Sequence, residues 1–199
     1  MNIDIKYNKT ALRDFQNKMK VRKNALPTLK NKEAALRAMV FETRDQLQKA
    51  EAEYRAVTLQ IAPWKELWKE FDPRLLEIKE VKTTVSKVAG IQIPVFEKME
   101  VEVVDFATTA YPDWFADGVE AMKRLLEANI KYKLLKKRLD LLEYARKKAT
   151  QKVNLYEKVQ IPSLESAIRQ IKRYLEDEDN LSKAGQKLLK SKIQRKAVS

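Results

Sequence analysis

Apolar residues recur at alternating steps of three and four from Leu12 to Ile61, and twelve of the fifteen positions on this repeat are apolar. Side chains at this spacing form one stripe along a helix. A stripe this long exceeds that of an ordinary globular helix and favours a coiled coil. We therefore expect a first helical arm over about residues 8–61. Its predicted seam residues are Leu12, Phe15, Met19, Leu29, Leu36, Val40 and Leu47.

Pro27 lies inside this arm. A proline removes one backbone hydrogen bond and crowds the preceding turn, so we expect a local kink there. The alternative is a helix that begins only at Pro27, with the proline in its first turn. Leu12, Phe15 and Met19 already keep the phase of the repeat, which favours the longer helix.

A second apolar stripe runs through the C-terminal part of the chain and predicts a second arm over about residues 112–189, with Asp113 or Asp117 as its cap. The phase of the apolar repeat slips by one residue near Pro162, where we also expect a second kink. One local distortion of the helix would account for both the slip and the kink. The basic tail over residues 190–199 is expected to fray. The predicted seam residues of this arm are Val153, Leu164, Ile168, Ile171 and Leu175.

The segment between the arms, about residues 62–110, changes from helical spacing to a period of two. β-Branched residues alternate with polar ones, which is a strand signal. Gly90 suits a turn and Pro94 suits an edge strand, so we predict a small β-hairpin that turns near Ala89–Gly90 or near Glu97. The alternating residues are Val81, Thr83, Val85, Ile91, Ile93, Val95, Val101 and Val103.

Trp64, Trp68 and Phe71 lie just before the hairpin, in a stretch that reads as a short connecting helix or turn. Two interpretations remain open. The aromatic residues are either an exposed site for a partner or, as is more common, a local core where the first arm ends.

Together these patterns predict a mainly α fold: a long antiparallel two-helix coiled coil with a small mid-chain β-hairpin and a short connecting helix. Neither apolar stripe is stable in water, so the two arms should pair if the insertion is the bend. We expect one elongated domain over residues 1–199.

Composition excludes several classes of function. The chain has no cysteine and no histidine, which removes thiolate ligands, the commonest general base and the commonest transition-metal ligand. Its three glycines are isolated and cannot form a phosphate loop. No apolar run approaches a membrane span and no signal peptide is recognisable. We expect a non-catalytic cytoplasmic protein without cofactor, metal or membrane insertion.

Charge is unevenly distributed within a formal net charge of +13. Residues 1–59 carry 13 basic against 7 acidic side chains, residues 60–117 carry 7 against 11, and residues 118–199 carry 21 against 10. Such asymmetry marks partner surfaces. Nucleic-acid binding and insertion among acidic protein surfaces explain the basic ends equally well.

One stretch of the second arm, residues 150–176, resembles the C-terminal helix of the D subunit of V-type and A-type rotary ATPases. Residues 8–32 and 89–94 are similar to the first arm and hairpin of that family, although the chain has Asn24-Ala25-Leu26-Pro27 where the family has a basic-Gly pair. The matching residues of the second arm are Val153, Asn154, Glu157, Ile161, Pro162, Leu164, Glu165, Ile168, Ile171, Leu175 and Glu176.

The resemblance implies a central rotor shaft that transmits torque between the catalytic A/B hexamer and the ion-translocating membrane ring. Its paired termini would enter the bore of the hexamer. Its lower part would bind the small stalk protein of the complex, the F subunit, and the coupling subunit of C or d type. ATP hydrolysis or synthesis would take place on the A and B subunits, with no nucleic acid involved. The alternative is a basic coiled-coil scaffold or nucleic-acid-binding protein.

Overall fold

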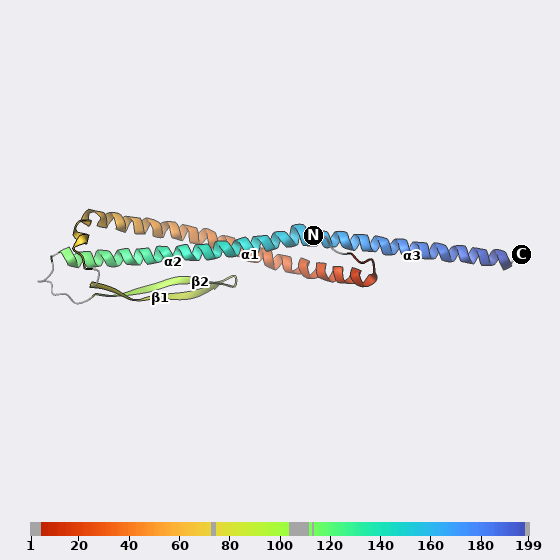
Figure 1. Ribbon diagram of the computed structural model, residues 1–199, viewed down its shortest axis with the longest axis horizontal. Helices are drawn as coiled ribbons and strands as arrows, with labels where there is room; N and C mark the ends of the chain where they lie inside the picture. Colours follow the sequence, from red (N-terminus) through yellow and green to blue (C-terminus); the bar gives the residue numbers. More distant parts are fainter. Residues whose placement is uncertain (1–4, 73–74, 104–111, 113, 198–199) are drawn as a thin grey trace. The chain divides into compact units, whose positions relative to one another are not determined.

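The computed structural model describes residues 5–72, 75–103, 112 and 114–197, and Figure 1 shows the order of their helices and strands. The predicted mainly α fold is confirmed, with two long helical arms and an antiparallel β-hairpin between them. In chain order the elements are α1 (Lys9–Ile61), the 3-10 helices η1 (Ala62–Trp64) and η2 (Leu67–Lys69), β1 (Leu76–Val88), β2 (Ile91–Val103), α2 (Trp114–Asn154), the π-helical segment η5 (Leu155–Gln160) and α3 (Ile161–Ala197).

The chain divides into two compact units. The terminal unit combines Met1–Asn31 with Ala149–Ser199, and the hairpin unit is Lys32–Lys148. Each unit contains a stretch of α1 and a stretch of the second arm. Organisation as a single elongated domain stays a prediction.

Helix α1 begins with a side-chain cap. The backbone N–H of Ala11 donates a 2.7 Å hydrogen bond to Oδ1 of Asn8, which satisfies one of the free donors at the helix start. The helix then continues through Pro27 to Ile61. A helix that starts only at Pro27 is therefore wrong, whereas the kink at this proline stays a prediction.

The terminal unit is held by a small apolar core. Ile171 is fully buried, and partly buried residues such as Leu12, Met19 and Leu175 pack around the core. Ion pairs join Lys23 to Glu165 and Lys30 to Glu157, so residue numbers rise on α1 as they fall on its partner. The two helices are therefore antiparallel here. The buried residues of this core are Phe15, Leu164, Ala167, Ile168 and Ile171.

The phase slip predicted near Pro162 has a structural cause. The second arm widens into the π-helical segment η5, where the N–H of Ile161 donates to the carbonyl oxygen of Tyr156, five residues back. A π-turn holds one residue more than an α-turn, which is the size of the slip. Pro162 follows directly and has no N–H to donate. The hydroxyl of Ser163 donates a 2.6 Å hydrogen bond to the carbonyl oxygen of Val159.

In the hairpin unit, α1 and α2 also run antiparallel. Arg44 pairs with Glu143, and the ring of Tyr54 stacks on that of Tyr132 with 6.0 Å between centroids. Fully buried side chains lie on both helices of this unit: Leu36 and Thr43 on α1 and Leu142 on α2.

The β-hairpin turns at Ala89–Gly90, which decides between the two turns left open by the sequence. Both residues have positive φ, 49° for Ala89 and 81° for Gly90, as a two-residue primed turn requires. Pro94 pairs with Val85 in the register of the two strands. Ile93 is fully buried, whereas most of β1 is exposed, so β2 supplies the buried side of the hairpin.

The aromatic residues after α1 form a local core. Trp68 contacts Phe71 and Trp114, and Phe71 stacks on the buried ring of Phe115. Gly118 lies beside them on α2, where a Cβ would come within 2.9 Å of the Trp114 ring. The interpretation as a local core is therefore favoured over an exposed partner site.

The ends of the second arm differ in part from expectation. Helix α2 starts at Trp114 with Asp117 in its first turn, whereas Asp113 lies outside the described residues. Helix α3 continues beyond residue 189 to Ala197. The expected end of the arm was therefore placed too early.

Candidate functional site

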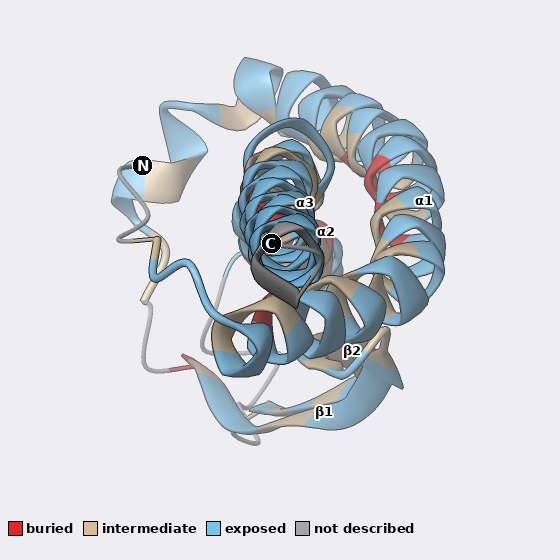
Figure 2. Cartoon of the chain, turned by 90° about the vertical axis from the view of Figure 1, so that its right-hand side faces the viewer, coloured by how far each residue is buried: buried red, intermediate tan, exposed pale blue. Residues whose placement is uncertain are grey.

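All twelve predicted seam residues lie on inward-facing positions of their helices. Phe15, Leu36, Val40, Leu164, Ile168 and Ile171 are buried, and Leu12, Met19, Leu29, Leu47, Val153 and Leu175 are half-buried. Figure 2 shows the buried and half-buried residues of α1 along one side of the helix, with the rest of its surface exposed. Both kink candidates, Pro27 and Pro162, are themselves exposed.

Polar contacts flank the seam of the terminal unit. The ammonium of Lys23 lies 2.6 Å from Glu165 and that of Lys30 lies 2.6 Å from Glu157, while Nε of Arg22 donates to Oε1 of Gln160 at 2.6 Å. The hydrogen bond and charge of Lys23 hold the pKa of the Glu165 carboxyl below its usual value. Because the two ion pairs are exposed, they fix the register of the two helices more than they add stability.

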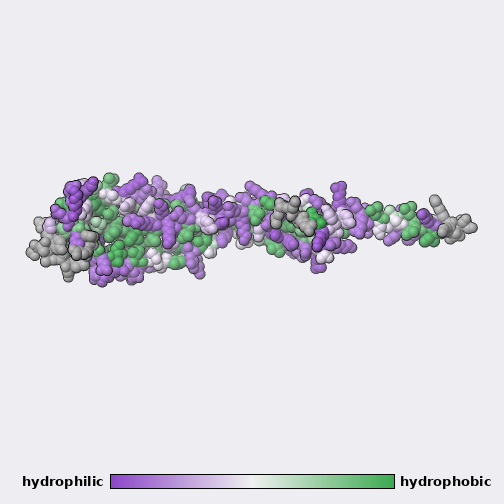
Figure 3. All heavy atoms as spheres, viewed as in Figure 1, coloured by the Kyte–Doolittle hydropathy of each residue, from purple (hydrophilic) through white to green (hydrophobic). Residues whose placement is uncertain are grey.

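The last part of α3 has no covering element among the described residues. Every side chain described from Glu176 to Gln194 is exposed, because α1 begins only at Lys9 and reaches no further along α3. Helical spacing nevertheless gathers apolar residues on one side of this stretch, and Figure 3 shows hydrophobic residues along it. We call this surface the α3 apolar stripe. It consists of Leu181, Leu188, Leu189 and Ile193, which are 62–74% exposed.

The side of α3 opposite the stripe is basic. Lys183, Lys187 and Lys190 fall there at about 100° per residue, whereas Lys192 falls on the side of the stripe, between Leu188 and Leu189. Lys183 pairs with Asp179 at 2.6 Å, and its hydrogen bond lowers the pKa of the aspartate. The sequence predicted a helix as far as about residue 189 and a basic tail only over residues 190–199, but it did not indicate that these four apolar residues stay uncovered.

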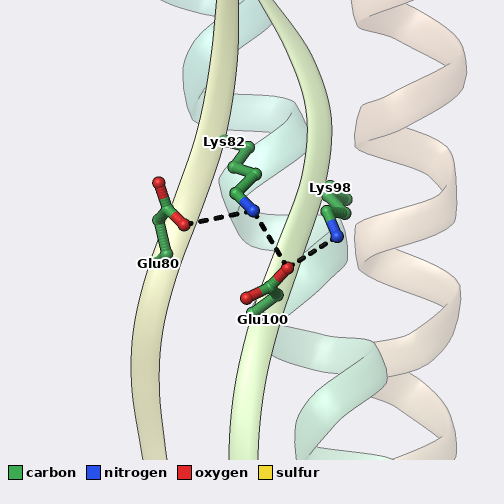
Figure 4. A network of polar contacts seen from close by, with 4 residues as sticks. All are labelled: Glu80, Lys82, Lys98 and Glu100. Carbon is green, nitrogen blue, oxygen red and sulfur yellow. Dashed lines mark hydrogen bonds and ion pairs between the residues drawn. The ribbon is translucent and has the colours of Figure 1, made fainter.

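The hairpin has a charged outer face. Lys82 reaches Glu100 at 3.2 Å and Glu80 at 3.4 Å, and Lys98 reaches Glu100 at 2.6 Å, as Figure 4 shows. Hydrogen bonds from Lys98 and Lys82 hold the pKa of the Glu100 carboxyl below its usual value. Two β-bulges interrupt the register of these strands, between Ile78 and Glu80 and between Lys82 and Thr83. Charge and bulges both protect an exposed edge from unwanted strand pairing.

Metal-ligand clusters and membrane-spanning helices are both absent from the described part of the chain. No group of three or more acidic, histidine or cysteine side chains there could hold a metal ion. None of the helices, over the residues that the structure describes, is long and apolar enough to cross a membrane. The arrangement offers helix surfaces and a charged hairpin, which are features for binding other proteins.

Comparison with known proteins identifies the family. The family of ATP synthase D subunits matches residues 11–191. The D subunit of the V-type ATP synthase of Borreliella burgdorferi is 31% identical over 195 residues, which cover 96% of both chains. The protein of the same name from Chlamydia pneumoniae is 26% identical over 200 residues, with 98% of this chain and 95% of the relative covered. The chain therefore belongs to the family of ATP synthase D subunits.

Proposed function

We propose that this chain is the central-stalk rotor subunit of a V-type or A-type ATPase. It transmits torque between the catalytic A/B hexamer and the ion-translocating membrane ring. Membership of the D-subunit family supports the assignment to the complex. The observation that carries the shaft role is the α3 apolar stripe, because a helix that exposes leucines along one side needs a surrounding surface to cover them.

The A and B subunits supply that surface in this proposal. Their surface, surrounding α3, would cover Leu181, Leu188 and Ile193. The lysines on the opposite side of α3 would lie near polar or acidic groups. Exposed, screened ion pairs contribute only about 0–1 kcal/mol each, so they would not hold the shaft at one angle. The contact would therefore let α3 rotate against the A and B subunits instead of holding it at one angle.

The paired helices supply stiffness. Twisting or bending them would disturb the close-packed core around Phe15, Ile168 and Ile171, and packed interiors deform little. We propose that the twelve seam residues serve this purpose and that Pro27 and Pro162 add curvature. Catalysis then belongs to the A and B subunits, and this chain needs neither cofactor nor metal. The small F subunit of the stalk and a coupling subunit of C or d type bind it on the cytoplasmic side of the membrane.

The test is reconstitution with the A/B hexamer and the F subunit, followed by ATPase and single-molecule rotation assays with a bead attached to this chain. We expect co-purification and ATP-driven rotation of the bead. Double substitution of Leu181 and Leu188 by Asp should weaken the contact between α3 and the A and B subunits and reduce rotation, because that contact would then bury two charges. Lys183→Gln with Lys187→Gln is the matched control on the opposite side.

A chain that fails to join the hexamer, and instead binds DNA with a steep salt dependence, would support the basic scaffold or nucleic-acid-binding alternative. A chain that joins the hexamer but stays still during ATP hydrolysis would refute the rotor role.

A further inference from the structure

A groove lies between the hairpin and the two helices of the hairpin unit. It is lined by α1 from Gln46 to Glu53, by β2 from Pro94 to Phe96, and by α2 from Lys131 to Arg138. Its volume is about 470 Å³. Figure 1 shows the hairpin lying along α2, with β2 nearer the helix than β1. All three walls belong to one unit, so the groove is a feature of that unit alone.

The walls of the groove combine apolar and basic side chains. Val95, Leu134 and Leu135 are only half-buried, although they lie between three elements. Lys49, Lys131 and Arg138 give the groove three cations against the single carboxylate of Glu53. The charge therefore favours an anionic occupant, and the apolar walls favour one with hydrophobic groups.

Two of the three cations already have partners. Lys49 pairs with Asp45 at 2.7 Å, one turn away on α1. Lys131 pairs with Glu127 at 2.7 Å and lies 5.6 Å from the centre of the Phe96 ring. Each of these two cations therefore already lies beside an acidic side chain of its own helix.

Arg138 differs from both lysines. Its Nε is buried and has no hydrogen-bond partner, and no ion pair joins its guanidinium to another described side chain. A buried donor without an acceptor destabilises the protein unless an acceptor is supplied. A carboxylate suits this group best, because it accepts two parallel hydrogen bonds from a guanidinium.

We propose that the groove binds a segment of another subunit, which places an Asp or Glu carboxylate on Arg138 and apolar side chains against Leu134, Leu135 and Val95. This inference rests on the proposed function, in which the chain works inside a complex. The wall from Gln46 to Glu53 runs for about 10 Å, or two helical turns. That length matches a short polypeptide segment with one acidic and two or three apolar contacts.

The test uses the whole complex, purified through a tag on this chain. Lys49, which is exposed at the rim of the groove, is replaced by the photo-crosslinking residue p-benzoylphenylalanine. Arg55, on the same helix but outside the groove, carries the same replacement as a control. After irradiation, mass spectrometry identifies the crosslinked peptide. We expect the Lys49 probe to capture a peptide of another subunit that contains an Asp or Glu beside apolar residues.

Charge reversal then tests the role of Arg138. Arg138→Glu should lower the crosslink yield at position 49 at least tenfold, whereas Lys137→Glu, an exposed neighbour outside the groove, should leave it unchanged. Replacing the captured carboxylate by Arg should restore the yield with Arg138→Glu. If that variant fails to assemble, Arg138→Gln replaces it. Its free chain should melt no lower than the wild type, because Nε of Arg138 has no partner to lose.

The proposal is overturned if the Lys49 probe captures no other subunit or captures only a segment without an acidic residue. It is also overturned if the yield is the same with Arg138→Glu. Co-purified A and B subunits and ATP-driven rotation are measured on the same preparation. A chain that co-purifies and rotates but gives no such crosslink contradicts only the groove proposal, whereas a chain that does not co-purify or rotate contradicts the rotor assignment.

Discussion

Thr43 offers the sharpest test of the seam. Thr43 is one of the three polar positions of the three-and-four repeat in α1; its side chain is fully buried, and its hydroxyl has no hydrogen-bond partner. Valine has nearly the same shape, so Thr43→Val removes the unsatisfied hydroxyl without opening a cavity. The substitution should therefore stabilise the hairpin unit, whereas most substitutions of buried residues destabilise a protein.

The size of the effect follows from the burial. A buried hydroxyl without a partner costs about 1–3 kcal/mol, and the added methyl group contributes further apolar burial. We expect the free energy of unfolding to rise by about 1–2 kcal/mol. For a chain of 199 residues that corresponds to a rise in Tm of about 2–8 °C.

The assay is thermal and denaturant unfolding of the purified chain, followed by far-UV circular dichroism and tryptophan fluorescence. Fluorescence reports on the hairpin unit, because Trp64, Trp68 and Trp114 all lie in it. Thr58→Val is the matched control on the same helix. The hydroxyl of Thr58 is exposed and donates to the carbonyl oxygen of Tyr54, so its loss should change stability by less than about 0.5 kcal/mol.

A Thr43→Val chain that unfolds at the same or a lower temperature than the wild type would refute this reasoning. The hydroxyl would then have a partner in solution, and the packing around position 43 would differ from the structure described above.

Three further predictions follow from the seam and the hairpin. Ile171→Ala should lower the free energy of unfolding by about 2–5 kcal/mol, because this side chain is fully buried. Leu188→Ala, on the exposed stripe, should change the free energy of unfolding of the isolated chain by less than about 0.5 kcal/mol. Denaturant unfolding measures both values. Ala89→Asn should stabilise the hairpin by about 1 kcal/mol, because asparagine tolerates positive φ before Gly90, and slower amide exchange in β1 and β2 would show it. The pKa of Glu100 is lowered in the folded state. Its ion pairs therefore stabilise the fold above the unfolded-state pKa, and this stabilisation is lost as the pH falls through the folded-state pKa. Lys98→Ala should raise the midpoint of the Glu100 titration measured by NMR.

The helical arms were predictable because their signal is repeated over many turns. Leu12, Phe15, Leu36 and Ile171 were identified from spacing alone, since only one side of a long helix can face its partner. The hairpin followed from alternating β-branched residues, but its turn did not. An alanine with positive φ at residue 89 is uncommon, so the sequence left two turns open.

Features that depend on contacts between distant residues were not predictable. Nothing local to Arg138 indicates that its Nε becomes buried without a partner, because the groove is made by three elements. Trp68 likewise contacts Trp114, which lies on the other side of the hairpin in the sequence, so no local pattern predicts this contact. The α3 apolar stripe is a different case, since its helical spacing was visible in the sequence, whereas its exposure depends on α1 beginning only at Lys9.

The π-helical segment η5 has a consequence for how this chain tolerates changes in length. Loss of one residue between Leu155 and Gln160 would turn the wide turn into ordinary α-helix and leave the apolar residues on either side facing α1. The same loss near Leu142 would rotate every later side chain by about 100° and carry Ile168 and Ile171 away from the core. Natural variants that differ by a single deletion should therefore place it in this segment.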